Sequence, residues 1–383
     1  MAGEGLGVKE QNLNLVKQAF KEFYFKHADY IETPLRIEER EFGYMQFNNG
    51  MIRHLSFKDR GELNAHLLKD IPSDVYCSCA YYSNPTAPIQ EKIFEGADLI
   101  FDIDADELPL TCHKEHEAWI CNDCKNVMTT KQNCSKCNSM KVEKTSLACD
   151  NCIDAGKREV KKLINLLKED LGVQENEIKV YFSGNHGFHL HIYSAELESL
   201  GSPSRVDIAD YVMGNSLIPD SFGIRKNTQV AKDVISKFPN TNDFGWRGRI
   251  SSKLMKDDKE KPRIVKRIMK NGYMQFKEEL NKIAREMGAH VDPKVTMDIH
   301  RVFRLQGTLN SKSGLAKAPC SDIDNFDPFT NACVLTDDEV SVHVRYSPKF
   351  RLRENPFGPF KDQVVKLPTY AAVYLICKGL ADI

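Results

Sequence analysis

The sequence predicts a mixed α/β protein in which a central mixed sheet carries an acidic site and a small metal-binding subdomain is inserted. Three observations predict this class. Helical and strand patterns alternate along the 383 residues, several strands are arranged as hairpins, and seven of the twelve cysteines fall between residues 112 and 152. Hairpins argue against a doubly wound sheet, in which single parallel strands alternate with helices.

Composition sets the size and environment of the protein. A 41% hydrophobic content in 383 residues is enough to bury a core, in one large or two moderate domains. The amino terminus shows neither an export signal nor a lipidation motif, so we expect a soluble, cytoplasmic protein without a membrane anchor. The apolar run 367–377 is too short to cross a bilayer, and we interpret it as a packed terminal helix.

The amino-terminal elements follow from their apolar spacing. Apolar residues at helical intervals predict an opening amphipathic helix of about 15 to 18 residues; they are Leu13, Val16, Phe20, Phe23 and Tyr24. Residues 40–57 then predict two short strands around an Asn-Asn-Gly turn, because these residues tolerate the backbone angles of tight turns. Arg53 would lie on the second strand.

The middle of the chain predicts a helix, a hairpin and a polar segment. The helix is expected from about Gly156 to Leu171, and the sequence IKVYF-SGNHG-FHLHIY predicts strand, glycine turn and strand. Residues 214–272 show little periodicity and are expected to form mobile or template-contacting loops. A helix is expected from about Met274 to Met287.

Two carboxylates one residue apart indicate a metal site. In a strand the period of two places Asp102 and Asp104 on one face, with Phe101 and Ile103 on the opposite, buried face. Neighbouring negative charges are costly unless a cation neutralises them, and Mg²⁺ prefers such oxygen ligands. Solvated acids at a strand end are the alternative interpretation.

Further polar residues extend this candidate site. Asp292, placed before Pro293 in an extended segment, offers a third carboxylate for a two-metal site, with Asp298 as a competing choice. Arg301 and Arg304 are spaced for one side of a helical turn that contacts a triphosphate, or they are surface arginines. The glycine turn supplies further candidate phosphate ligands, namely Ser183, Gly184, His186 and His189.

The cysteine spacing predicts a zinc site. Cys121-x2-Cys124 and Cys134-x2-Cys137 are two knuckles nine residues apart, which suits four thiolates around tetrahedral Zn²⁺. We therefore divide the chain into an amino-terminal core part (residues 1–111), a zinc-binding insertion (residues 112–152) and a carboxyl-terminal core part (residues 153–383).

The ordered motifs resemble a known family. FDIDADELP, then YFSGNHGFHLHI, then VDPKVTMDIHRVFRLQGTLNSKSG resemble the small catalytic subunit of archaeo-eukaryotic primases, and REFGYMQF, MIRHLSF and LPTYAAVYLICKGLA resemble segments of its archaeal members. The resemblance implies a primase small-subunit fold and DNA-directed nucleotidyl transfer. Its implied partners are a single-stranded DNA template, nucleoside triphosphates and a large primase subunit that completes a heterodimer.

The resemblance also implies residue roles. Asp102, Asp104 and Asp292, preferred over Asp298, would hold two Mg²⁺ or Mn²⁺ ions, and the glycine-turn residues and both arginines would contact the nucleotide. Glu41 and Arg53 match polar positions near the family's active site. Two positions depart from the family pattern: His186 stands where relatives often carry arginine, and Asn310 where many carry histidine.

A second zinc set follows from the same resemblance. The cysteines that flank the first set resemble the single zinc site of shorter archaeal relatives, so we expect two nested structural zinc sites; the second set is Cys112, His116, Cys149 and Cys152, with His113 as the alternative histidine ligand.

Two functional alternatives stay open. The first is a gap-filling or translesion primase-polymerase, and the second is a non-catalytic zinc-ribbon subunit that binds nucleic acid.

The stretch 247–270 contains ten basic residues against three acidic ones, which is typical of phosphate contact or of a solvated charged loop.

Overall fold

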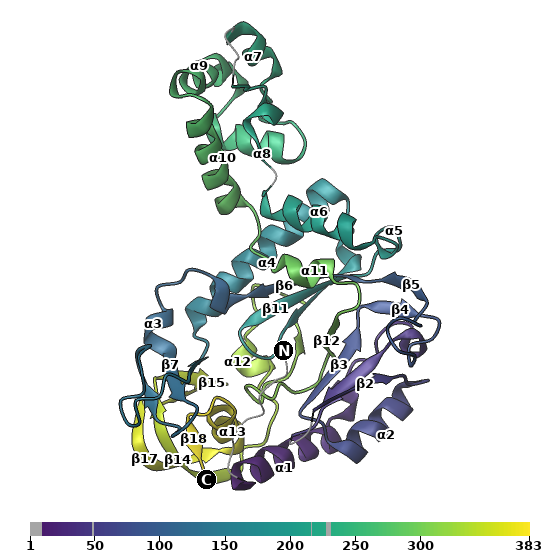
Figure 1. Cartoon of the computed structure of the whole chain (residues 1–383), viewed down its shortest axis with the longest axis vertical. Coiled ribbons are helices and arrows are strands. Elements are labelled where there is room, and N and C mark those ends of the chain that lie inside the picture. Colours follow the sequence, from purple (N-terminus) through teal and green to yellow (C-terminus); the bar gives the residue numbers. More distant parts are fainter. Residues whose placement is uncertain (1–9, 48–49, 216, 227–230) are drawn as a thin grey trace. The chain divides into compact units, whose positions relative to one another are not determined.

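The computed structural model describes residues 10–47, 50–215, 217–226 and 231–383, and the chain is organised in two compact units (Figure 1). The first unit contains the described residues up to Lys157 together with Lys179–Ser199 and Asp298–Ile383. The second contains Arg158–Ile178 and Leu200–Met297. The expected zinc-binding insertion, residues 112–152, belongs to the first unit, and each unit is described by itself.

The first unit begins with the expected helix and hairpin. Helix α1 (Glu10–Lys26) buries its apolar stripe, and strands β1 (Phe42–Met45) and β2 (Met51–Leu55) pair antiparallel. Both predictions are confirmed, although Asn48 and Asn49 of the predicted turn lie outside the described residues. Helix α2 (Arg60–Asp70) leads to β3 (Asp74–Ser78), and the sheet order is β12-β3-β1-β2, with β12 at Val302–Arg304.

A four-stranded sheet carries the acidic pair. Its order is β13-β10-β11-β6, formed by Ala318–Pro319, Ile178–Phe182, Gly187–Ile192 and Leu99–Asp104. The antiparallel register sets His189 opposite Asp102 and Gly187 opposite Asp104. The other face of these strands is fully buried, because Phe101, Ile103, Phe188 and Leu190 alternate with the polar positions. The hairpin predicted around the glycine turn is confirmed.

A small three-stranded sheet lies within the cysteine-rich segment. Helix α3 (His113–His116) precedes strands β7 (Glu117–Cys121), β8 (Val127–Met128) and β9 (Val142–Ser146), in the order β8-β7-β9. Helix α4 (Asp150–Leu171) follows, and it begins six residues before the predicted Gly156. The earlier start is consistent with burial of Cys152 and Ile153, which extend the apolar stripe of the helix by one turn.

The carboxyl-terminal part completes the first unit. Strands β14 (Glu339–Ser347), β17 (Phe360–Pro368) and β18 (Ala381–Asp382) form the sheet β17-β14-β18. Helix α13 (Thr369–Cys377) is buried along its whole length, which confirms the packed terminal helix. The remaining elements are β4 (Ala80–Tyr82), β5 (Phe94–Ala97), α5 (Ala195–Glu198), α12 (Pro328–Asn331), β15 (Phe350–Leu352) and β16 (Asn355–Phe357).

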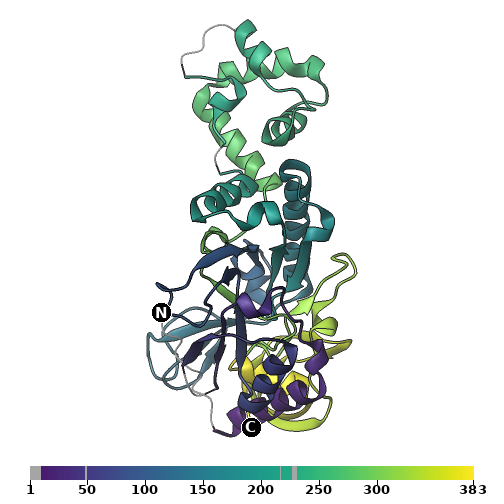
Figure 2. The same ribbon diagram turned by 90° about the vertical axis from the view of Figure 1, so that its right-hand side faces the viewer.

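The second unit is helical, and the prediction of loops over 214–272 is wrong for most of that segment. It contains α6 (Ser202–Met213), α7 (Ala231–Lys237), α8 (Gly245–Leu254), α9 (Lys261–Asn271), α10 (Tyr273–Met287) and α11 (Pro293–Met297), which Figure 2 draws in colours from teal to green. Buried Ile264, Val265 and Ile268 give α9 an apolar face, so its high charge concealed a short amphipathic helix. The helix predicted from about Met274 is confirmed as α10.

No helix in the described ranges combines the length and the apolar character that crossing a membrane requires. Mixed α/β architecture with several antiparallel pairings is the observed class, as predicted.

Candidate active site and metal centres

The acidic pair lies on one face of β6. Asp102 and Asp104 are partly exposed, whereas Phe101, before the pair, and Ile103, between the two acids, are fully buried. The Oδ1 atom of Asp104 accepts a hydrogen bond of 2.9 Å from the backbone N–H of Asp106, at the start of a short 3₁₀ turn. The two carboxylates therefore face the same side of the sheet, as the strand period requires.

His189 lies against this pair from the neighbouring strand. Its Nε2 atom is 3.5 Å from Asp102 Oδ1, and its ring packs against Phe303, with ring centroids 5.9 Å apart. Burial holds the pKa of His189 well below its usual range, and the nearby cations Lys317, Arg304 and Arg301 act in the same direction. The imidazole is therefore neutral and is suited to hydrogen bonding rather than to charge pairing.

The glycine turn is held by backbone geometry. Ser183 N–H donates to Gly187 O at 2.8 Å, and Gly187 N–H donates to Ser183 Oγ at 3.2 Å. Gly184 has a φ of +86°, which favours glycine, and a Cβ on Gly187 would lie 2.3 Å from Ile103 O. Asn310 donates to Ser183 O at 3.4 Å, so the downstream loop braces this turn.

His186 of the same turn points into a buried polar network. Its Nδ1 lies 3.1 Å from Asp106 Oδ2, and its Nε2 lies 3.1 Å from Ser146 O and 3.2 Å from Lys378 Nζ. Only 4% of His186 is exposed, so its expected contact with a nucleotide stays a prediction. Asp104, Asp106 and His186 also bring ligand atoms within 4.8 Å of one another. Asp106 was missed although it is the third acid of the sequence DIDAD.

The two arginines do not form a helical turn, and that prediction is wrong. Arg304 belongs to strand β12, which pairs with β3, and exposed Arg301 directly precedes it. A spacing of three puts residues on opposite faces of a strand. Arg304 Nη1 lies 2.5 Å from Asp74 Oδ1 and 2.8 Å from Leu309 O, so a carboxylate that sequence reasoning missed anchors it.

Glu41 and Arg53 form a partly buried ion pair. Arg53 Nε donates to Glu41 Oε1 at 2.9 Å, and Lys92 Nζ lies 3.1 Å from Glu41 Oε2. Burial alone would disfavour the charged carboxylate, but Arg53 and Lys92 outweigh it and hold the pKa of Glu41 below its usual value. The structure thus brings these two predicted residues together and adds Lys92.

Lys317 is a fully buried lysine that contacts the sheet carrying the acidic pair. It precedes β13, lies 3.0 Å from His191 Nε2 and donates to Arg304 O at 2.9 Å. Burial lowers the pKa of Lys317 to about 7, and the Arg304 charge adds to that effect. Asp102, Cys77 and Glu32 act in the opposite direction.

This shift predicts a pH-dependent stability. Since the pKa of Lys317 is about 7 in the folded chain and 10.5 in an unfolded one, the unfolded state binds more protons between these values. Stability should therefore rise with pH across that window in the native chain but not in Lys317→Met. We expect the difference in free energy of unfolding between the native chain and Lys317→Met to change by about 2 kcal/mol between pH 7 and pH 9, as measured by urea titration. Exposed Lys312→Met is the control, and parallel pH profiles of Lys317→Met and the native chain would contradict the assignment.

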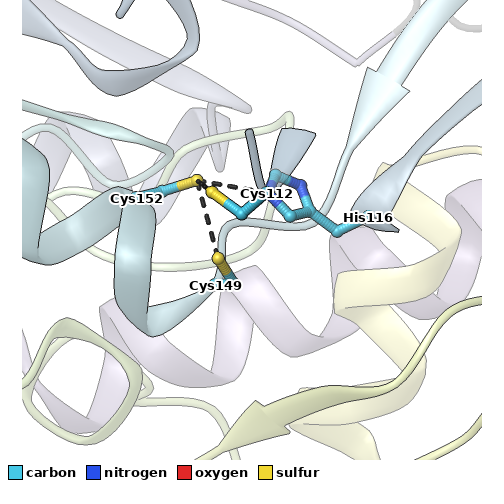
Figure 3. Close-up of side chains that lie close together, drawn as sticks. All are labelled: Cys112, His116, Cys149 and Cys152. Atoms are coloured by element: carbon cyan, nitrogen blue, oxygen red, sulfur yellow. Dashed lines mark hydrogen bonds between the residues drawn. The ribbon is translucent and has the colours of Figure 1, made fainter. Parts of the chain in front are cut away.

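One candidate metal centre combines three cysteines and a histidine (Figure 3). Cys152 Sγ lies 3.6 Å from Cys112 Sγ, 3.7 Å from Cys149 Sγ and 3.2 Å from His116 Nε2. A tetrahedral zinc ion with Zn–S bonds of about 2.3 Å holds sulfur ligands about 3.8 Å apart, so this set fits zinc. His116 is the histidine in the set, whereas Nδ1 of the alternative, His113, lies 3.7 Å from Glu117.

The second candidate centre is the pair of knuckles, whose four sulfur atoms also converge. Cys121 Sγ lies 3.5 Å from Cys137 Sγ, and Cys124 Sγ lies 3.4 Å from Cys134 Sγ. The two knuckles repeat the same backbone. Each ends in a residue with positive φ, Lys125 at 58° and Asn138 at 57°, whose N–H donates to the carbonyl of its first cysteine. All twelve cysteines are described, and none forms a disulfide.

Asp292, in the second unit, directly precedes helix α11, so the residues after it are helical and the predicted extended segment is wrong. Its Oδ1 accepts from Lys294 N–H at 2.9 Å, and its carbonyl accepts from Val295 N–H, as expected for a helix cap followed by proline. Asp298, the competing acid, belongs to the first unit and accepts from His300 N–H. Asp292 belongs to one unit, and Asp102 and Asp104 belong to the other. That these three carboxylates share one metal site is therefore a proposal.

Fold and site together define a mixed α/β protein with an acidic pair on a sheet face, a glycine turn beside it and two zinc-type centres. Comparison with known proteins makes the class specific. The family model for the DNA primase small subunit matches residues 137–322. The DNA primase small subunit PriS of Nitrosopumilus maritimus is 45% identical over 98% of this chain and 100% of that protein. Those of Cenarchaeum symbiosum and Archaeoglobus fulgidus are 41% and 31% identical, over 97% and 96% of this chain and 99% and 97% of those proteins. The chain belongs to the DNA primase small subunit family.

Proposed function

We propose that the chain is the catalytic subunit of a DNA primase. It makes short primers on single-stranded DNA by two-metal nucleotidyl transfer from nucleoside triphosphates, with release of pyrophosphate. One observation carries this proposal: in a member of this family, Asp102 and Asp104 share a sheet face directly opposite His189 and Gly187 of the glycine turn.

The acidic residues are suited to the expected ions. Asp102 and Asp104 offer hard oxygen donors on one partly exposed face, which fits Mg²⁺ or Mn²⁺, and Asp292 is proposed to complete the set. When bound, such ions activate the attacking 3′-hydroxyl and neutralise charge on the leaving pyrophosphate. These carboxylates would hold the ions, and backbone N–H groups fix two of them in place: that of Asp106 for Asp104 and that of Lys294 for Asp292.

The neighbouring residues are proposed to hold the nucleotide. Half-buried Ser183 and the backbone N–H of the buried Gly184 are proposed to take triphosphate oxygens, and neutral His189 donates a hydrogen bond without adding charge. Arg301 and Arg304 supply positive charge, the latter from a position already fixed by Asp74. Glu41 and Arg53 form part of the surrounding polar wall, and buried His186 positions the turn through Asp106.

Both cysteine centres are proposed to hold structural zinc, because a segment this short has little core of its own. We propose that a large primase subunit completes a heterodimer with this chain. The protein acts in the cytoplasm on the DNA template.

The test is synthesis on unprimed single-stranded DNA with each nucleotide set. The proposal expects short products that start without a primer. A gap-filling or translesion enzyme would instead extend existing primers without starting new ones. A non-catalytic zinc-ribbon subunit would bind DNA and make no product, and that outcome with the large subunit present would overturn the proposal.

A further inference from the structure

The second unit contains an open cavity of its own among helices α8, α9 and α10. Its volume is about 380 Å³. Three basic side chains, one acidic one and two aliphatic ones line it, namely Lys253, Arg263, Arg267, Glu279, Leu254 and Ile264. We call it the helical groove. A cavity with three cations and one anion has an excess of positive charge and favours an anionic occupant.

Helix α9 forms a basic wall of this groove. Its eleven residues, KPRIVKRIMKN, contain five lysines or arginines and no acidic residue. Its apolar side is packed into the unit through buried Val265 and Ile268, so the basic residues are left on the solvent side. The helix therefore presents positive charge along its length, at a spacing set by the helical turn.

The charge around the groove is far from the average of the chain. Residues 245–287 contain thirteen Lys or Arg and six Asp or Glu, a net charge of +7, whereas the whole chain carries −1. The remaining residues therefore carry −8. Such a local concentration in a nearly neutral protein is typical of a surface that contacts phosphates.

The existing partners of the lining cations are exchangeable. Arg263 Nη2 lies 2.6 Å from Glu260, Arg267 Nη2 lies 2.9 Å from Glu279, and Lys253 pairs with Glu286. The cationic side chains in these pairs are 42% to 73% exposed, so solvent screens each pair and it contributes little to stability. A phosphate can replace a carboxylate there at little cost.

We infer that the helical groove binds the phosphodiester backbone of single-stranded DNA, through charge and without reading sequence. This inference rests on the proposed function, because it names the template as the occupant. The lining contains no aromatic residue and only two aliphatic ones, of which Ile264 is buried and Leu254 half-buried, whereas the centre of a protein interface is typically aromatic and apolar. The observations therefore favour a nucleic acid over an acidic protein.

The test is fluorescence anisotropy of a labelled oligothymidine with the full chain at several salt concentrations. The variant Lys253→Gln/Arg263→Gln/Arg267→Gln removes the three lining charges. Since each phosphate contact on a single strand contributes about 0.7 to the salt slope, the slope should fall by about 2 and Kd at 0.1 M salt should rise at least about tenfold. The matched control, Lys349→Gln/Lys361→Gln/Lys366→Gln, removes three exposed lysines of the first unit and should change neither value.

Further variants keep the result decisive. If the triple variant unfolds, Arg263→Lys/Arg267→Lys should retain binding, because it preserves the charge that phosphates meet. Unchanged Kd and slope in a folded triple variant would overturn the inference. So would a loss of affinity for the large subunit with DNA binding intact, which would indicate a protein occupant. Asp102→Asn tests the proposed function separately, since it should strongly lower synthesis without changing this binding.

Discussion

Asp102→Asn in the full chain is expected to lower primer synthesis by about 10²–10³-fold, because it removes one charged oxygen ligand at the point where charge develops during nucleotidyl transfer. Binding of single-stranded DNA should be unchanged. The side chain is nearly isosteric and partly exposed, so the free energy of unfolding should also change little. Synthesis on unprimed DNA and anisotropy with the same oligonucleotide measure the two effects.

The control for this prediction is Asp338→Asn, an exposed acid of the same unit, which should keep full activity. Asp292→Asn provides an independent check of the third proposed ligand and should match Asp102→Asn in size. Full activity in Asp102→Asn would exclude the acidic pair from catalysis. Full activity in Asp292→Asn alone would remove only that residue from the proposed set.

Cys152→Ser is expected to reduce bound zinc from two ions per chain to one and to lower stability on the order of 3 kcal/mol or more. The effect should be large because Cys152 Sγ lies within 3.7 Å of all three other members of its set. The residue is also buried at the beginning of α4, so the ion would join the helix to the cysteine-rich sheet. Elemental analysis and urea unfolding of the purified chain measure both quantities.

Cys121→Ser should also lose one zinc ion, but its effect on global unfolding should be smaller. Its cluster packs with Met128, Trp119 and Val142 of the small sheet alone. Cys320→Ser, a buried cysteine outside both sets, should keep two ions. One zinc ion or none in the native chain would refute the nested arrangement.

Local patterns in the sequence predicted much of the fold because they depend on neighbouring residues. The strand period placed Asp102 and Asp104 on one face, and the C-x2-C spacing predicted knuckles whose sulfur atoms do converge. The apolar run 367–377 likewise predicted α13, and apolar spacing predicted α1. In α9 the same kind of signal was present in Ile264, Val265 and Ile268, but the surrounding charge obscured it.

Partners distant in the chain were not predictable in the same way. Nothing near Arg304 indicates that it belongs to a strand, because β12 is only three residues long and is defined by pairing with β3. Its carboxylate partner Asp74 lies 230 residues away. The burial of His186 likewise depends on Ser146 and Lys378, which come from the cysteine-rich segment and the carboxyl-terminal part.

The sequence by itself therefore determined the chemistry of this protein: which acids, cysteines and glycines it contains and how each is spaced within its own element. The tertiary structure alone decided which histidine joins the cysteine set, how Arg304 is anchored and where Lys317 is buried. The physical reason is one of range. Periodicity and turn preference act over a few residues, whereas burial and ion pairing arise only when distant strands are packed together.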